Sequence, residues 1–266
     1  MHVPNLPRPL ALSLALAGVL AVALPRPATA VDPNWDHYKV YIASPKFSAT
    51  IPVVLGDQFA TTPHTTQYLD FFANPVDKYL PDTGQDFPIH DGLTHYTWWR
   101  VSDAVFNATV LVDNQFGVQS LLVTRATYLL NPALKNTTGP LPLENHYKCY
   151  ECSGNPVQRI VRLTDQFDQV LTTVMVPRFL CNPTRKTVPN QPPPNVYEIV
   201  DPTQHYVCYE IEPDPATFSA SVSDQFTPAA LQLGFSPGFM LCVPSDKTSV
   251  TGSLKDTWGA LKMLYR

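Results

Sequence analysis

The chain has 266 residues, a formal net charge of −4 and charged side chains at only 15% of its positions. This acidic balance offers no basic face for nucleic acid and no polybasic patch for anionic lipid, so neither is an expected partner. Proline occupies 28 positions, which favours short strands and ordered loops over long helices.

Residues 1–30 are typical of an export signal. Arg8 precedes an apolar run from residue 10 to residue 24, and Ala28 and Ala30 form an A-x-A cleavage site. The run is shorter than the roughly 20 residues of a membrane span. We therefore expect cleavage after Ala30, no transmembrane segment afterwards, and a periplasmic, cell-surface or extracellular location. An uncleaved anchor is the alternative.

The rest of the chain carries four copies of one pattern. Each copy opens with a His-Tyr pair, continues to a Gln-Phe pair and closes with a proline and a lysine. The His-Tyr pairs are His37-Tyr38, His95-Tyr96, His146-Tyr147 and His205-Tyr206, and the Gln-Phe pairs are Gln58-Phe59, Gln115-Phe116, Gln166-Phe167 and Gln225-Phe226. The spacing predicts four repeat units, at residues 31–90, 91–141, 142–200 and 201–253, with a tail at 254–266.

Strands are predicted from alternating apolar residues within each unit. The best examples are residues 205–211 as a first strand and residues 170–176 as a returning strand. The Asp or Asn before each Gln-Phe is expected to form an Asx-turn between two strands, and Gly117 suits the hairpin connection in unit 2. The last strand is expected to stop at Pro183, which lacks an N–H. Unit 1 is the most degenerate copy. Its return segment, residues 61–66, lacks apolar alternation, so we do not expect it to pair in a regular β-ladder.

These elements predict an all-β protein. Four tandem units of antiparallel strands would form sandwich-like layers, joined by Pro-rich crossings such as residues 189–194. A four-bladed propeller is the alternative. The tail is expected to form a short helix.

Four of the five cysteines predict two disulfides. Unit 3 carries Cys149 and Cys181, and unit 4 carries Cys208 and Cys242 at the equivalent positions, whereas units 1 and 2 carry a cysteine at neither position. Such paired presence predicts Cys149–Cys181 and Cys208–Cys242. Cys152 remains as a spare thiol or an intermolecular link, with a redox role of its C-x-x-C spacing as the alternative.

The order His-Tyr-x-Cys-Tyr, Asp-Gln-Phe, Phe-Leu-Cys-x-Pro-x-x-Lys resembles a tandem domain of unknown function in secreted proteins of environmental bacteria. The resemblance is close from His146 to Lys247 and weaker in units 1 and 2, where the cysteine pair is absent. It implies a repeat architecture and brings no activity with it.

Residues that recur in every unit, including the histidines and the Asp-Gln-Phe elements, are interpreted as packing elements. Residues that occur once are the better candidates for a binding surface, and they are His90, Asp91, Trp98, Trp99 and Arg100. Adjacent tryptophans can form a platform for a sugar or a cation, although in a strand one of them faces the core.

No sequence motif identifies a catalytic residue, a cofactor or a metal site. The sequence thus favours an exported, non-catalytic structural or binding module with a surface glycan or a protein as its partner. A secreted hydrolase with its site at a junction between units is the alternative.

Overall fold

The computed structural model describes residues 31–190 and 193–252, and all of their regular secondary structure is β-strand. The strands are β1 (His37–Ser48), β2 (Pro52–Gly56), β3 (Thr61–Leu80), β4 (Gln85–Phe87), β5 (His95–Asn114), β6 (Gly117–Lys135), β7 (His146–Ser153), β8 (Arg159–Thr164), β9 (Gln169–Val188), β10 (Asn195–Tyr197), β11 (His205–Asp214), β12 (Phe218–Asp224) and β13 (Thr227–Gly252). The predicted export signal and the predicted helix in the tail lie outside the described residues. None of the described segments is a helix that could cross a membrane.

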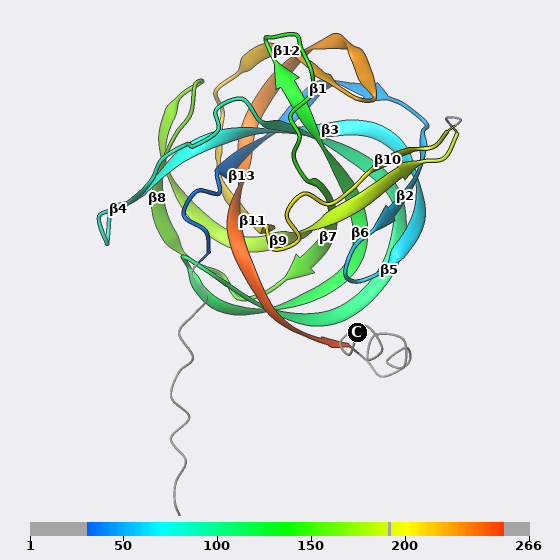
Figure 1. The fold of residues 1–266 in the computed structure, drawn as a ribbon. Coiled ribbons are helices and arrows are strands. Elements are labelled where there is room, and N and C mark those ends of the chain that lie inside the picture. Colours follow the sequence, from blue (N-terminus) through cyan, green and yellow to red (C-terminus); the bar gives the residue numbers. More distant parts are fainter. Residues whose placement is uncertain (1–30, 191–192, 253–266) are drawn as a thin grey trace, which may run out of the picture.

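Eight strands pair antiparallel in a closed ring, in the order β1, β3, β5, β6, β7, β9, β11 and β13, with β13 pairing again with β1. Figure 1 shows these strands curving around a common centre. Each unit contributes an opening strand (β1, β5, β7, β11) and a closing strand (β3, β6, β9, β13). Since strands of adjacent units are hydrogen-bonded to each other, the units do not form the separate sheets of propeller blades.

A second layer of hairpins lies against this ring, one hairpin from each unit. The hairpins are β2 with the start of β3, the end of β5 with the start of β6, β8 with the start of β9, and β12 with the start of β13. Each hairpin pairs with the closing strand of the unit two places away: β2 with β9, β5 with β13, β8 with β3, and β12 with β6. This antiparallel, layered architecture confirms the predicted all-β fold class.

Four tyrosines, one from each His-Tyr pair, pack against one another in a cycle on one face of the ring strands. Tyr38, Tyr96, Tyr147 and Tyr206 meet edge to face, with ring centroids 5.1 to 5.7 Å apart around the cycle. Both disulfides, Cys149–Cys181 and Cys208–Cys242, belong to the same buried cluster and confirm the predicted pairing. The recurring tyrosine therefore supplies a core shared by all four units.

Two further cores combine side chains of the ring strands with side chains of the hairpins. Val110 and Val161 of the hairpins of units 2 and 3 pack with Tyr209 and Leu241 of the ring. The hairpins of units 1 and 4 pack in the same way with Tyr41, Phe72 and Trp99 of the ring, through Val53, Leu55, Ala220 and Val222. Period-two alternation in each hairpin thus reflects one face packed on the ring.

The prediction that the last strand stops at Pro183 is wrong, because β9 continues through Pro183 to Val188. Pairing of β9 with β11 ends at Cys181, so Pro183 has only Tyr147 of β7 as a partner. A missing N–H is tolerated at a position that is paired on one side only.

The expectation for the return strand of unit 1 is also wrong. Residues 61–65 pair with β2 in an unbroken register from Gly56↔Thr61 to Pro52↔Thr65. The apolar face of this hairpin comes from Val53 and Leu55 of β2, which are both buried. One strand can therefore supply the burial that its partner lacks.

Candidate functional site

Trp98 and Trp99 do not form a surface platform, because both side chains are fully buried. Adjacent strand residues point to opposite faces, so Trp98 packs with the four tyrosines and Trp99 packs under the hairpins. The indole Nε1 of Trp99 donates a hydrogen bond to Asp224 at 2.7 Å. The structure therefore corrects the platform expectation and places both tryptophans in the core.

His90, Asp91 and Arg100 remain at least partly exposed. The backbone N–H groups of His90 and Asp91 donate to the carboxylate of Asp36, at 2.6 and 2.8 Å. Arg100 donates to Asp103 at 2.9 Å and lies over the ring of Tyr128. Arg100 and the His90-Asp91 pair therefore have separate partners, and a binding role for the three stays a prediction.

The most elaborate polar arrangement occurs four times, where the tip of each hairpin meets two other units. We call these places junctions A to D and name them by the turn that enters. Junction A receives Asp165-Gln166-Phe167, junction B receives Asp224-Gln225-Phe226, junction C receives Asp57-Gln58-Phe59, and junction D receives Asn114-Gln115-Phe116.

The Asp or Asn of each turn has two tasks, which are clearest at junction B. Asp224 Oδ1 accepts hydrogen bonds from the backbone N–H groups of Phe226 and Thr227 at 2.7 and 2.9 Å, which forms the predicted Asx-turn. Its Oδ2 accepts hydrogen bonds from Trp99, Thr97 and Asn131 of unit 2. One carboxylate therefore closes its own hairpin and fixes it to the unit opposite.

The phenylalanine of each turn lies against a lysine, which is buried at junctions A, B and D and half-buried at junction C. Lysine Nζ lies 4.0 to 5.1 Å from the ring centroid in the pairs Lys247–Phe59, Lys78–Phe116, Lys135–Phe167 and Lys186–Phe226. This is a cation–π geometry. At every junction the closing lysine of one unit therefore contacts the turn phenylalanine of another unit.

The glutamine of each turn joins the same arrangement. At junction B, Gln225 Nε2 lies 2.8 Å from Asn131 Oδ1 and 3.0 Å from His146 Nε2. At junctions C and D the glutamines contact His205 and His37 in the same way. Burial lowers the pKa of His205 and of His95 to about 3 and that of His37 and His146 well below its usual value. The four histidines are therefore neutral structural groups, as expected for residues that recur in every unit.

Junction D differs from the other three in its chemistry. Asn74, Asn131 and Asn182 each donate to the turn carboxylate of their junction, but the equivalent residue in unit 4 is Val243 and the turn of unit 2 carries Asn114 in place of Asp. Asn114 donates to Tyr209 Oη and Ser245 Oγ at 2.9 and 3.0 Å instead. Junction D therefore lacks both the asparagine and the aspartate that the other three junctions share.

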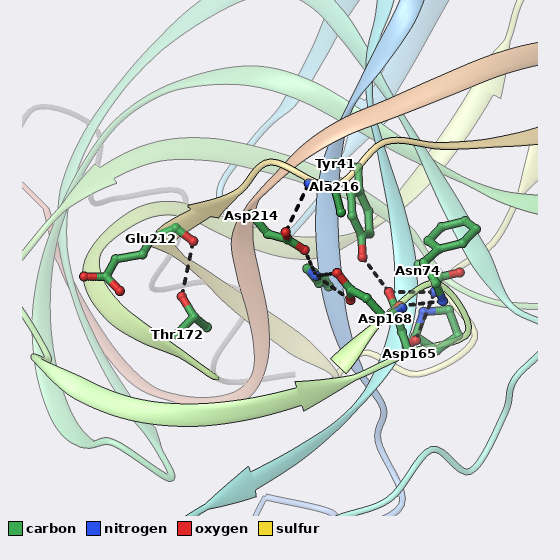
Figure 2. A network of polar contacts seen from close by, with 11 residues as sticks. Tyr41, Asn74, Asp165, Asp168, Thr172, Glu212, Asp214 and Ala216 are labelled. Carbon is green, nitrogen blue, oxygen red and sulfur yellow. Dashed lines mark hydrogen bonds and ion pairs between the residues drawn. The ribbon is translucent and has the colours of Figure 1, made fainter. Parts of the chain in front are cut away.

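One ionic cluster in the described part of the chain has no counterpart at the equivalent positions of the other turns. Lys39 Nζ, which is fully buried, lies 2.9 Å from Asp168 and 3.0 Å from Asp214, and so joins units 1, 3 and 4. Figure 2 shows these two carboxylates together, beside Asp165 with its partners Tyr41 and Asn74. The residue after the turn phenylalanine is Ala60, Gly117 or Thr227 in the other units, so the cluster is specific to this place.

The two carboxylates of this cluster have different proton affinities. Burial, followed by a hydrogen bond with Asp214, raises the pKa of Asp168 to about 6. Burial also acts on Asp214, but hydrogen bonds with Asp168, Lys39 and the N–H of Ala216 outweigh it and lower its pKa to about 2. Two neighbouring carboxyl groups with separated pKa values are a known arrangement for acid–base chemistry.

The described part of the chain contains a small cavity and a larger pocket. The cavity beside the tyrosine cycle measures about 10 Å³, which is at most the size of one water molecule. A pocket of about 260 Å³ is lined mainly by residues 141–146 and 196–200, among them Leu141, Val196 and Tyr197. Its volume is just below the roughly 300 Å³ at which small-molecule sites begin. Within the described residues no group of three or more His, Cys, Asp or Glu side chains could hold a metal ion.

Cys152 is a free, buried thiol. Burial raises its pKa well above the usual value, so the reactive thiolate is disfavoured. Cys149, its partner in the C-x-x-C spacing, is bonded to Cys181, as the prediction of a spare thiol requires.

Sequence reasoning missed two parts of this chemistry. The pattern Asn-Pro-x-x-Lys recurs at Asn74, Asn131 and Asn182, and comparing the residue before each proline would have found it. The Lys39 cluster carries no such signal, because its members are 129 and 175 residues apart and only the fold brings them together.

Comparisons with known proteins agree with a repeat architecture. A family model described as "Repeat of unknown function (DUF7450)" matches residues 93–243, which is more than half of the chain. No significant match is found among curated proteins or among solved structures.

Proposed function

Because the chain belongs to the family of repeats of unknown function DUF7450, whose description states no activity, we propose that it is an exported, non-catalytic structural or binding module of the cell surface or extracellular space. One observation carries this proposal. The side chains that define the repeat form hydrogen bonds and cation–π contacts at the junctions, where the Asp, Gln and Phe of one unit meet residues of other units. The side chains that recur in every unit thus contribute to assembly of the ring.

The two disulfides support the exported location, since such bonds persist in oxidising compartments. Cleavage of residues 1–30 belongs to the same proposal. The pocket of about 260 Å³, lined by apolar side chains with Glu144 and Glu198, is the place we assign to a ligand in a binding role.

Secretion and binding are tested separately. Expression of residues 1–266 should yield protein outside the cytoplasm that begins at Val31. Retention of the uncleaved chain in the cytoplasm would contradict export. The purified protein should gain thermal stability with a glycan or protein partner from a screened set. Replacing Leu143, which is exposed in the pocket lining, with Asp should abolish that gain, and exposed Leu171 on the β8–β9 hairpin provides the control.

A secreted hydrolase remains the second candidate, now motivated by the carboxylate pair at Lys39. In such an enzyme Asp168, with its pKa raised to about 6, would donate a proton and Asp214, with its lowered pKa, would stay ionised. Activity on generic ester, peptide and glycoside substrates that disappears in Asp168→Asn and in Asp214→Asn would support this candidate. Equal activity in both variants and the wild type would exclude this cluster as its site.

A further inference from the structure

Three buried asparagines contact a lysine of the next unit along the chain. Lys135 Nζ donates to Asn74 Oδ1 at junction A, Lys186 Nζ donates to Asn131 Oδ1 at 2.7 Å at junction B, and Lys247 Nζ donates to Asn182 Oδ1 at 3.4 Å at junction C. The side chains of Asn131 and Lys186 have no exposed surface, and that of Asp224 beside them is 2% exposed. A primary amine and an amide carbonyl are thus held together away from water.

We infer that these pairs react within the folded chain to form amide cross-links, in which lysine Nζ bonds to asparagine Cγ and ammonia is released. The links would be Asn74–Lys135, Asn131–Lys186 and Asn182–Lys247. This is a covalent modification that goes beyond the proposed function and does not depend on it.

The reaction is balanced within each junction. The lone pair of lysine Nζ attacks asparagine Cγ, and the carbonyl electrons move to Oδ1. The aspartate carboxylate takes a proton from the attacking nitrogen and delivers it to Nδ2. When the carbonyl re-forms, the Cγ–Nδ2 bond breaks, ammonia leaves and the aspartate is unchanged. No oxidant, reductant or activated donor is needed.

The lysines are suited to act as nucleophiles because the attacking form is the neutral amine. Burial lowers the pKa of Lys135 to about 8 and that of Lys247 to about 7, although the nearby carboxylates of Asp165 and Asp57 oppose the shift. Burial lowers the pKa of Lys186 well below its usual value. The lowered pKa of each lysine increases the fraction of the amine that carries a free lone pair at neutral pH.

The remaining groups of junction B lie where the reaction needs them. Gln225 Nε2 donates to Asn131 Oδ1 at 2.8 Å, so it would stabilise the negative charge that this oxygen gains. Asp224 Oδ2 accepts from Asn131 Nδ2 at 3.4 Å, on the nitrogen that leaves. Gln166 and Asp165 make the same contacts with Asn74 at junction A.

The cross-links would connect the four units covalently along the chain. Each link joins one unit to the next, closing loops of 61, 55 and 65 residues, whereas the disulfides lie within units 3 and 4. Junction D would join unit 4 to unit 1, but Val243 offers no amide and Asn114 offers no carboxylate. Both reacting partners of Lys78 are absent at the same junction.

The test is the intact mass of the folded, purified wild-type protein, measured after unfolding and reduction of the disulfides. We expect a mass below that of the unmodified sequence by one ammonia molecule for each link, and up to three in total. Peptide mapping should then find Asn131 and Lys186 in one branched peptide. Pro75, Pro132 and Pro183 follow the three asparagines and have no N–H, so succinimide formation at these asparagines cannot imitate the loss.

Variants assign the loss to the junctions. Lys186→Met should restore the mass of one ammonia, while Lys78→Met, the matched change at junction D, should leave the deficit unchanged. A wild-type protein with the full sequence mass would overturn the inference, and so would a deficit that Lys186→Met, Lys135→Met and Lys247→Met all leave in place. The wild-type measurement decides the question even where a variant fails to fold.

Discussion

Junctions B and D share a backbone arrangement but bury their lysines in different chemical surroundings. At junction B, Lys186 contacts Asn131, which in turn donates to Asp224. At junction D, Lys78 Nζ contacts the ring nitrogen of His37 and the faces of two phenylalanines. The position of the asparagine is taken by Val243.

This difference shows that asparagine and aspartate work as a pair. An amide without its carboxylate would leave a buried donor unsatisfied, and a carboxylate without the amide would leave a buried acceptor with fewer partners. Junction D has lost both groups, while the turn, the glutamine and the Lys–Phe contact are retained. The hairpin docks at both junctions, so docking does not require the asparagine–aspartate pair.

The largest effect should come from removing the carboxylate at junction B. Asp224→Ala leaves the donors of Trp99, Thr97 and Asn131 unsatisfied in a buried site, and we expect a loss of about 3–5 kcal/mol in the free energy of unfolding. Asn114→Ala, the matched change at junction D, should cost only about 1–3 kcal/mol. Urea unfolding at pH 7.5 measures both, and equal losses would remove the distinction between the junctions.

A smaller effect should follow from rebuilding the pair at junction D. Val243→Asn places an amide in a fully buried position and should cost about 1–3 kcal/mol. Adding Asn114→Asp supplies an acceptor and should recover part of this loss, with a coupling energy of about 0.5–3 kcal/mol. A double-mutant cycle in urea measures the coupling, and strictly additive losses would show that the two positions do not interact.

The buried histidines should make the fold sensitive to acid. The folded pKa of His205 is lowered to about 3 from an ordinary value of 6.5, so below pH 6.5 the unfolded chain binds a proton that the folded chain excludes. The free energy of unfolding should therefore decrease as the pH falls from 6.5 towards 3, by at most about 1.4 kcal/mol per pH unit for each histidine. His205→Gln should reduce this slope, measured by urea unfolding at pH 7.5 and pH 5.0. His90→Gln, a change at an exposed histidine, should not reduce it.

The smallest effect is expected for Lys78 itself. Lys78→Met replaces a fully buried amine, which is bonded to no carboxylate among the described residues, with an apolar side chain of similar length. We expect a change within about 1.5 kcal/mol in either direction. Lys186→Met should be more costly, because Asn131 then loses a donor. Thermal unfolding of the two variants side by side gives the ranking, and the reverse order would contradict our account of junction D.

Four features of this protein were determined by its sequence alone. They are the all-β class, the repetition, the Asx-turns and both disulfides. Each depends on local alternation or on comparison between copies, as when Cys149 and Cys181 appear together in unit 3 and are both absent from unit 1. A repeated unit provides its own alignment, so positions that vary together are visible within one chain.

Only the tertiary structure decided where the repeated residues meet. The turn at Asp224 contacts Trp99 and Asn131 of unit 2, and its Phe226 contacts Lys186 of unit 3. No local sequence pattern predicts that a hairpin docks on the unit two places away. Continuation of β9 through Pro183 and burial of both Trp98 and Trp99 likewise depended on which strands became neighbours. Ring closure sets these contacts, because it brings together residues up to 125 positions apart whose chemistry is complementary only across units.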